Sequence, residues 1–103
     1  MNLEKYIQHK LNNEIYHGIE EVKNIHGRID ILTPTEIIEL KEISKYKHGV
    51  GQLLAYSTIY PNRKLVLYVF GTPDEIVRYQ NPCMNYCLKS NIEYKVAKVE
   101  III

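Results

Sequence analysis

Two acidic residues and a lysine on neighbouring predicted strands are the side chains best suited to chemistry in this sequence. Asp30 lies in the middle of one predicted strand, where aspartate is disfavoured by propensity, and Glu39 and Lys41 lie on the next. Residues i and i+2 of a strand point to the same face, so Glu39 and Lys41 project side by side. If the strands pair through a turn at Pro34, Asp30 lies opposite them. Two carboxylates and an ammonium group then meet in one patch.

A divalent cation is the occupant that such a patch favours. Two carboxylates about 4 Å apart repel by about 4 kcal/mol at an effective dielectric constant of 20, and a bound cation removes that repulsion. Oxygen ligands of this kind suit Mg²⁺, which keeps several of its waters. A metal ion held here polarises a phosphoryl oxygen and lowers the pKa of a bound water, while the lysine orients that water. These residues predict a phosphodiesterase that uses Mg²⁺, with Mn²⁺ as a substitute.

The elements that must position these residues follow from the spacing of apolar and turn-forming residues. They predict an α/β protein of order αβββαβαβ, in which helices flank a mixed central sheet. Asn2 caps the first helix, Thr72 caps the last with Glu75 in a capping box, and Asn81-Pro82 predicts an irregularity in that last helix. The predicted helices cover 3–13, 46–59 and 71–91, and the predicted strands cover 19–25, 28–33, 36–43, 64–70 and 92–103.

Length, charge and cysteine content narrow the class of protein. A chain of 103 residues predicts a single domain over 1–103. A net charge of +1 does not favour nucleic-acid binding by the chain as a whole, so such binding requires a local basic patch. Cys83 and Cys87 lie four residues apart, which predicts free, buried thiols in a reducing compartment. With no apolar run near 20 residues and no signal peptide, we expect an intracellular protein of the cytoplasm or nucleoid and no membrane contact.

Four short motifs in order resemble the PD-(D/E)XK, or restriction-endonuclease-like, nuclease superfamily. The central signature is Asp30 followed by Glu39-Leu40-Lys41, and the first helix carries Glu4 ahead of two aliphatic residues at helical spacing. Gly27-Arg-Ile-Asp30 and Gln52-Leu-Leu-Ala-Tyr56 are similar to the motifs of its RecB-like branch. The resemblance covers about residues 4–71 and departs at Ile29, which stands where the motif has a proline that many members lack. It implies a restriction-endonuclease-like core, and makes the chain a single minimal nuclease-like domain.

The resemblance also implies a role for each matching residue. Asp30 and Glu39 would bind the metal ion, with Leu40 contributing its carbonyl and Glu4 reaching in from the first helix. Lys41 would position the attacking water, and Gln52 would act with it or contact phosphate. Glu14, Glu20 and Glu21 compete with Glu4 as the third acidic residue. The residues expected to contact DNA are Tyr56, Lys45, Lys47, His48 and Arg28.

These residues and motifs are compatible with three functions. The first is a Mg²⁺-dependent deoxyribonuclease whose substrate is chosen by DNA structure or by a partner. It would act as a homodimer, joined through the Ile101–Ile103 tail or the tyrosine-rich last helix. The second is a catalytically silent nucleic-acid-binding or accessory module with the same fold. The third is a structural αβ protein in which Asp30, Glu39 and Lys41 form a cross-strand salt-bridge ladder.

Overall fold

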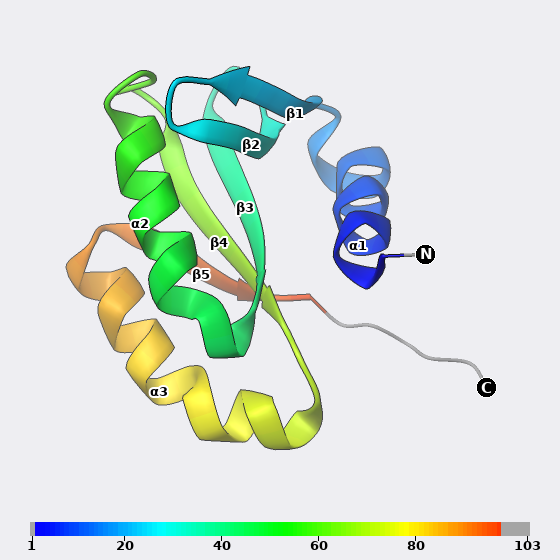
Figure 1. The fold of residues 1–103 in the computed structure, drawn as a ribbon, viewed down its shortest axis with the longest axis vertical. Helices are drawn as coiled ribbons and strands as arrows, with labels where there is room; N and C mark the ends of the chain where they lie inside the picture. The colour runs from blue at the N-terminus through cyan, green and yellow to red at the C-terminus, as the bar shows by residue number, and fades with distance from the viewer. Residues whose placement is uncertain (1, 98–103) are drawn as a thin grey trace.

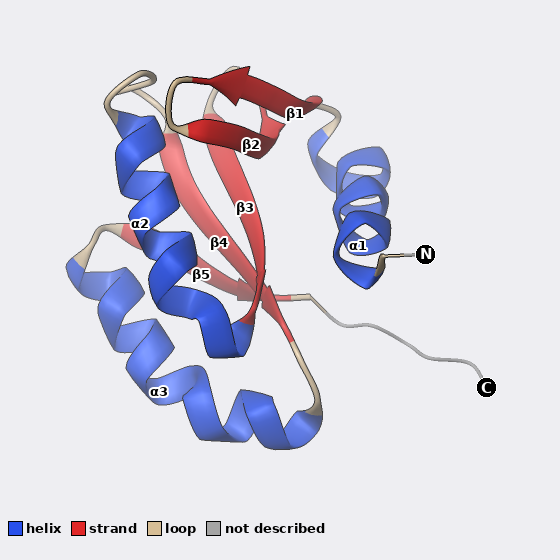
Figure 2. Ribbon diagram, viewed as in Figure 1, coloured by secondary structure: helices blue, strands red, loops and turns tan. Residues whose placement is uncertain are grey.

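A five-stranded mixed sheet with three α-helices forms the protein in the computed structural model, which describes residues 2–97 (Figures 1 and 2). The α/β class and the predicted order of elements are confirmed. The strands are β1 (Ile19–Asn24), β2 (Gly27–Leu32), β3 (Glu36–Glu42), β4 (Lys64–Phe70) and β5 (Ile92–Val96). The helices are α1 (Leu3–Leu11), the π-helical turn η1 (Asn12–Tyr16), the 3₁₀ turn η2 (Ile43–Lys45), α2 (Tyr46–Ser57) and α3 (Pro73–Lys89).

The sheet combines an antiparallel and a parallel part, and β3 belongs to both. Its strand order is β1-β2-β3-β4-β5, with β1, β2 and β3 forming an antiparallel meander. β4 runs parallel to β3, and β5 runs parallel to β4. Parallel neighbours need a crossover, and α2 and α3 supply the two crossovers here.

The helices cover the two faces of the sheet unequally (Figure 2). α2 and α3 lie on one face, where Val50, Leu53 and Cys83 pack against alternate residues of β3 and β4. α1 lies on the other face, where Ile7 packs against Leu40 and its neighbours. Because β4 is covered on both faces, all of its residues except Lys64 are buried, as its nearly uninterrupted apolar run predicted.

The predicted helix caps are confirmed, but the predicted irregularity in α3 is wrong. The Asn2 side chain accepts a hydrogen bond from the Glu4 amide, and Thr72 and Glu75 form a reciprocal capping box. α3 runs through Pro82 as one 17-residue helix. Pro82 is exposed, while its neighbour Cys83 and Cys87 one turn later are buried, so packing on that side holds the helix together. Both cysteines are free thiols, as predicted.

The chain departs from the prediction after α1 and at the end of β5. The helical path does not end at Asn12-Asn13 but continues as the π-helical turn η1 and ends at His17, whose φ is 52°. The Asn12 side chain explains this continuation, because it bonds both the amide and the carbonyl of Gly18. β5 ends at Val96, and the remainder of the predicted strand, with the Ile101–Ile103 tail, lies outside the described residues. Within residues 2–97, no helix combines the length and the apolar character needed to cross a membrane.

Candidate functional site

The two predicted acidic residues meet where β2 and β3 separate. The backbones of the two strands pair only at Ile31–Ile38 and Leu32–Ile37. Beyond that point, the Asp30 amide donates to Glu39 Oε1 at 3.0 Å, and the Leu40 amide donates to Asp30 Oδ2 at 2.8 Å. Each carboxylate therefore accepts a backbone N–H from the other strand, in place of the missing ladder bonds. We call these two residues the Asp30–Glu39 pair.

Glu39 is buried and Asp30 is half-buried, and neither forms an ion pair with a described basic residue. Burial raises the pKa of Glu39 to about 9, and the nearby charge of Asp30 adds to this shift. Burial also raises the pKa of Asp30 to about 6, although the hydrogen bond from the Leu40 amide opposes the shift. The Lys41 charge lowers both pKa values but does not cancel the effect of burial. At neutral pH the pair therefore holds a proton, or is suited to hold a cation instead.

Lys41 and α2 lie close together beside this pair. A Cβ atom on Gly49 of α2 would come within 2.8 Å of the Lys41 Cγ atom and of Leu67 Cδ1. Any larger residue at position 49 would therefore displace Lys41 or open the core. Gln52, one turn further along α2, is half-buried, and its side-chain oxygen is buried without a hydrogen-bond partner.

Tyr56 connects α2 to the hairpin formed by β1 and β2. Its ring is fully buried, and its hydroxyl donates to the Arg28 carbonyl at 3.0 Å. Burial, with the charges of Glu39 and Asp30, raises the pKa of Tyr56 to about 12. In this position Tyr56 holds the hairpin against α2, and its ring does not reach the surface on which we expected it to contact DNA.

The candidate third acidic residues lie in different surroundings. Glu4 and Glu21 are half-buried, and their charges raise the pKa of Asp30. Glu21 stands opposite Asp30 in the register of β1 and β2, has a φ of 56°, and forms an ion pair with Lys5 of α1. Glu14 is exposed. Among residues 2–97, no three His, Cys, Asp or Glu side chains form a group that could hold a metal ion.

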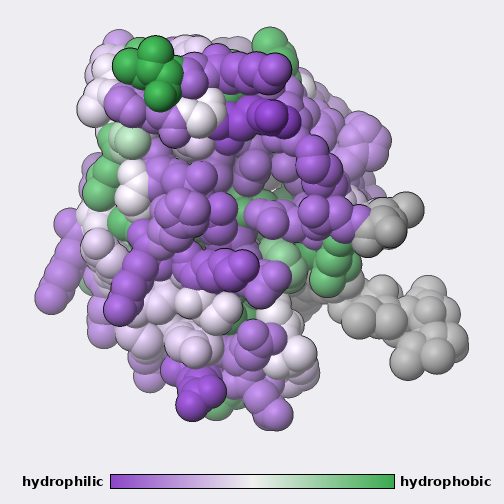
Figure 3. Space-filling model, in the orientation of Figure 1, coloured by the Kyte–Doolittle hydropathy of each residue, from purple (hydrophilic) through white to green (hydrophobic). Residues whose placement is uncertain are grey.

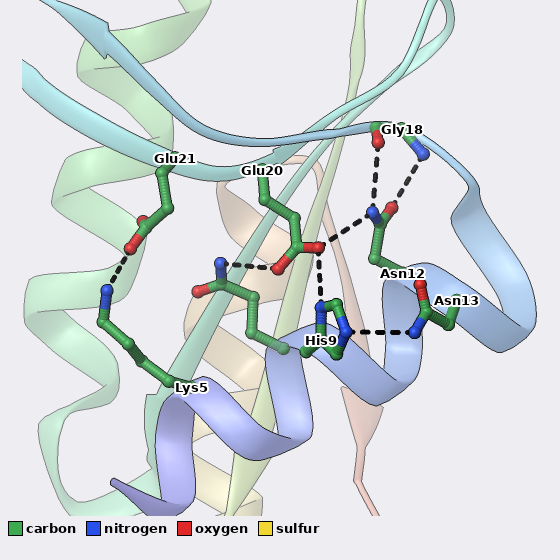
Figure 4. Close-up of polar contacts among 8 residues, drawn as sticks. Lys5, His9, Asn12, Asn13, Gly18, Glu20 and Glu21 are labelled. Atoms are coloured by element: carbon green, nitrogen blue, oxygen red, sulfur yellow. Dashed lines mark hydrogen bonds and ion pairs between the residues drawn. The ribbon is translucent and has the colours of Figure 1, made fainter.

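Glu20 takes part in a polar cluster that sequence reasoning missed (Figure 4). Its carboxylate accepts hydrogen bonds from Gln8 Nε2 and Asn12 Nδ2, both at 3.2 Å, and lies 3.1 Å from His9 Nδ1. Burial opposes ionisation of Glu20, but these three contacts outweigh it and lower the pKa. We call these four residues the Glu20 cluster. The signal in the sequence was the group of polar side chains Gln8, His9 and Asn12 towards the end of the first helical segment.

Exposed basic residues lie at the start of α2 and on the hairpin. Lys45, Lys47 and His48 surround the first turn of α2, which contains no acidic residue and no side-chain cap. Arg28 and its cross-strand neighbour Lys23 are exposed on the hairpin. None of these five residues forms an ion pair with another described residue. Figure 3 shows that hydrophilic residues cover much of the face on which α2 lies.

Two further basic residues near α2, Arg63 and Lys64, have partners within the protein. Arg63 donates to the Thr33 carbonyl, and its guanidinium lies over the ring of Tyr60. Lys64 forms an ion pair with Glu93 of β5 at 2.6 Å. Of these two residues, Lys64 alone is paired with a described acidic side chain.

Three curated proteins of Acanthamoeba polyphaga mimivirus are similar to this chain. KilA-N domain-containing protein L33 is 43% identical over 95 residues, which cover 90% of this chain and 36% of that protein. Proteins R878 and L32, described in the same way, are 37% and 40% identical over 92% and 70% of this chain. The chain spans about a quarter to a third of the length of L33 and R878. No family model matches the chain, and no solved structure is significantly similar to it.

These comparisons contradict the assignment to the PD-(D/E)XK nuclease superfamily. The relatives are named for a KilA-N domain, and none is described as a nuclease or a hydrolase. The predictions of superfamily membership and of deoxyribonuclease activity are therefore wrong, and the restriction-endonuclease-like core has no support. The short motifs misled because Asp30 and Glu39 have a structural role that demands the same spacing, as acceptors for the opposite strand. No finding supports the homodimer, and the intracellular location stays a prediction.

Proposed function

We propose that this chain is a DNA-binding module without catalytic activity of its own. Its relatives are named for a KilA-N domain, and KilA-N domains form a family of DNA-binding domains, which favours the silent module over the enzyme. The chain spans only part of those relatives, so what the whole proteins do is outside this proposal.

The observation that carries the proposal is the group of unpaired cations at the start of α2. The N-terminal end of a helix carries partial positive charge, and acidic residues normally occupy its first turn. α2 has Lys45 and Lys47 there instead, with His48 beside them, all exposed, and no side-chain cap. The two lysine charges repel each other in the unbound protein, and a DNA phosphate group relieves that repulsion. Because the Tyr46 amide already donates to the Ile43 carbonyl, the lysine side chains are the groups that would bind phosphate oxygens.

A divalent cation at the Asp30–Glu39 pair is the second part of the proposal. The donor set fits Mg²⁺, which binds through one or two carboxylates and keeps its remaining waters. Asp30 and Glu39 would hold the ion, the Leu40 carbonyl is the proposed third oxygen, and Glu4, whose charge acts on Asp30, is the proposed further carboxylate. The raised pKa values support this, because a carboxylate pair that shares one buried site is stabilised by a proton or by a cation. Such an ion would attract a DNA phosphate to the Asp30–Glu39 pair.

Binding to DNA is tested by fluorescence anisotropy with a labelled 20-base-pair duplex over a series of salt concentrations. We expect Lys45→Ala and Lys47→Ala each to weaken binding of all sequences alike, and to reduce the slope of log affinity against log salt by about 1. Lys10→Ala is the matched control, because Lys10 is equally exposed but belongs to α1. Wild-type protein that binds no duplex would overturn the proposal, and so would equal losses in all three variants.

Absence of catalysis is tested with linear, single-stranded and branched DNA in Mg²⁺ or Mn²⁺. We expect every substrate to stay intact, for wild type and for Lys41→Ala alike. Cleavage by the wild type that disappears in Lys41→Ala would contradict the silent module and restore the enzymatic hypothesis.

Cation binding is tested by calorimetric titration of the protein with MgCl₂ in the absence of DNA. We expect a binding heat for the wild type that is lost in Asp30→Asn. Glu20→Gln is the control, because it neutralises a carboxylate that already has its own hydrogen-bond donors. A heat that is equal in Asp30→Asn and the wild type would exclude the pair as the site.

A further inference from the structure

An isoleucine stands at the tip of the β1–β2 hairpin with almost its whole side chain in solvent. Ile25 is 89% exposed, more than any other large apolar residue among the described residues. Exposed apolar side chains are common one at a time, so exposure alone says little. The place of Ile25 and the residues around it make it unusual.

Ile25 contributes nothing to the turn in which it lies. The loop has two residues, Ile25 and His26, between the paired residues Asn24 and Gly27. The turn is formed by its neighbours, because Asn24 Oδ1 accepts from the His26 amide at 2.8 Å and Gly27 has a φ of 131°. Glycine, asparagine, aspartate and serine are the usual residues of such turns, and a β-branched apolar residue is a poor choice. The turn itself therefore does not explain an isoleucine here.

The hairpin tip is braced on α2. The Tyr56 hydroxyl donates to the Arg28 carbonyl, and His26 Nε2 lies 3.4 Å from Thr58 Oγ1. The backbone at Gly27 lies so close to α2 that a Cβ atom there would be 3.1 Å from the Tyr56 hydroxyl. These contacts fix the hairpin tip against α2, so the Ile25 side chain stays directed away from the rest of the protein.

The surroundings of Ile25 carry only positive charge. Lys23 and Arg28 face each other across the hairpin, both exposed, and His26 is exposed beside them. No acidic residue occurs from Val22 to Ile29, and none of the three basic residues is in an ion pair with a described residue. An apolar tip with cations at its base is complementary to a polyanion that has an apolar interior.

We propose that the hairpin tip is a DNA-contacting wedge. Lys23 and Arg28 contact phosphates on either side of a groove, and Ile25 inserts between two base pairs and partly unstacks them. Apolar side chains of this kind enter base steps in proteins that bind the minor groove. This inference rests on the proposed function and adds to it the mode of contact.

The distance along α2 is compatible with one duplex reaching both basic regions. The hairpin tip is braced at Thr58, and Lys47 lies eleven residues earlier in the chain. At a rise of 1.5 Å per residue these positions are about 16 Å apart. That is about five base pairs of DNA at 3.4 Å each. Gly51, between them, is exposed and has open space above it, so the duplex can approach the helix closely.

The experiment separates unstacking of bases from binding. A duplex containing 2-aminopurine at successive positions reports unstacking by its fluorescence, and anisotropy of an end label on the same duplex reports binding. We expect wild-type protein to raise the 2-aminopurine signal at one or two positions. Ile25→Asn abolishes this rise and weakens binding about tenfold. Asparagine suits a turn, so this variant folds, and Ile25→Leu restores both signals. Leu88→Ser is the matched control, an 80% exposed apolar residue on α3.

Each outcome decides between the wedge and the proposed function. Duplex binding by the wild type with no 2-aminopurine rise, and unchanged in Ile25→Asn, overturns the wedge and leaves DNA binding intact. No duplex binding by the wild type overturns both. An equal loss in Leu88→Ser also overturns the wedge, because the effect then belongs to exposed apolar surface in general. A 2-aminopurine rise with single-stranded RNA but not with duplex DNA would assign the tip to a different nucleic acid and overturn the proposal as stated.

Discussion

Two acidic sites on adjacent strands of this protein behave in opposite ways. The Asp30–Glu39 pair is buried, receives one backbone N–H on each carboxylate, and has raised pKa values. Glu20 on β1 is more open to solvent, has three side-chain partners from α1 and η1, and has a lowered pKa. Burial disfavours the charged form at both sites. It prevails at the more deeply buried Asp30–Glu39 pair, where the two carboxylates also repel each other, and it is outweighed at Glu20 by the three side-chain partners.

The opposite pKa shifts indicate which acidic residues are available to bind a ligand. The Glu20 cluster satisfies its own carboxylate and ties α1 to β1, so Glu20 gains little from a cation. The Asp30–Glu39 pair has no such group of donors and gains from a proton or a cation. Five predictions test this contrast, in order of decreasing effect.

Asn12→Ala should lower the free energy of unfolding by about 3 kcal/mol, the largest change. Asn12 is buried, and its side chain bonds the amide and the carbonyl of Gly18 as well as Glu20. Its loss leaves buried polar groups unpaired, at about 1–3 kcal/mol each. Urea denaturation measures the change, with exposed Asn13→Ala as the control. Equal stability of the two variants would mean that the Glu20 cluster does not hold α1 in place.

Mg²⁺ should stabilise the wild type through the Asp30–Glu39 pair alone. A ligand that binds only the folded state raises the free energy of unfolding by about 2.7 kcal/mol at 100 times its dissociation constant. Thermal unfolding at increasing MgCl₂ should therefore show a rising midpoint for the wild type and for Glu20→Gln, and none for Asp30→Asn. A rise that survives in Asp30→Asn would place the ion elsewhere.

Glu39→Gln should stabilise the protein at pH 8 by about 1 kcal/mol or more, because each unit of pKa shift corresponds to about 1.4 kcal/mol. The pKa of Glu39 is about 9 in the folded protein against its ordinary value of 4.5, so the folded state holds a proton that the unfolded state releases. Wild-type stability therefore falls as pH rises from about 4.5 towards 9. Denaturant midpoints between pH 5 and 8 should fall with pH in the wild type and stay flatter in Glu39→Gln.

The contribution of Glu20 to the free energy of unfolding depends on pH in the opposite direction. Its lowered pKa contributes stability that is present above pH 4.5 and is lost as the pH falls through the folded-state value. Glu20→Gln should therefore lose stability at neutral pH but approach the wild type in acid. A difference in stability between the wild type and Glu20→Gln that is the same below and above pH 4.5 would contradict this contribution.

Lys5→Ala should have the smallest effect, below about 1 kcal/mol. The Lys5–Glu21 ion pair joins α1 to β1 near the Glu20 cluster, but the Lys5 side chain is 61% exposed. Exposed ion pairs contribute about 0–1 kcal/mol and are screened by salt. Chemical denaturation at low and high NaCl concentration should show a small difference that disappears in high salt. A loss of unfolding free energy as large as that of Asn12→Ala would mean that the Lys5–Glu21 ion pair, and not the Glu20 cluster, holds α1 in place.

Much of the fold could be predicted because its signals are local. Helix caps at Asn2 and Thr72 and the apolar run of β4 depend on residues near one another in sequence. The prediction failed where distant contacts prevail over local preference. Pro82 did not interrupt α3, because its buried neighbours Cys83 and Cys87 hold the helix in place. Asn12-Asn13 did not end the first helical segment, because Asn12 bonds Gly18.

The candidate site, like the fold, could be predicted only where its signals are local. Strand alternation and one short turn were enough to place Asp30 beside Glu39, since both lie a few residues from Pro34. Similar motifs then suggested a nuclease, and the relatives contradict that assignment. Spacing alone could not reveal that the same carboxylates complete the backbone bonding between β2 and β3.

Local sequence patterns were sufficient to predict the order of helices and strands, the caps, the free thiols and the meeting of two carboxylates. Contacts between distant segments place Glu20 against α1, bury Tyr56 and leave Ile25 exposed to solvent. The reason is that α1 and α2 approach β1 and β2 from distant parts of the chain. The twist of the sheet and the packing of both faces set that approach, and no short stretch of sequence encodes either.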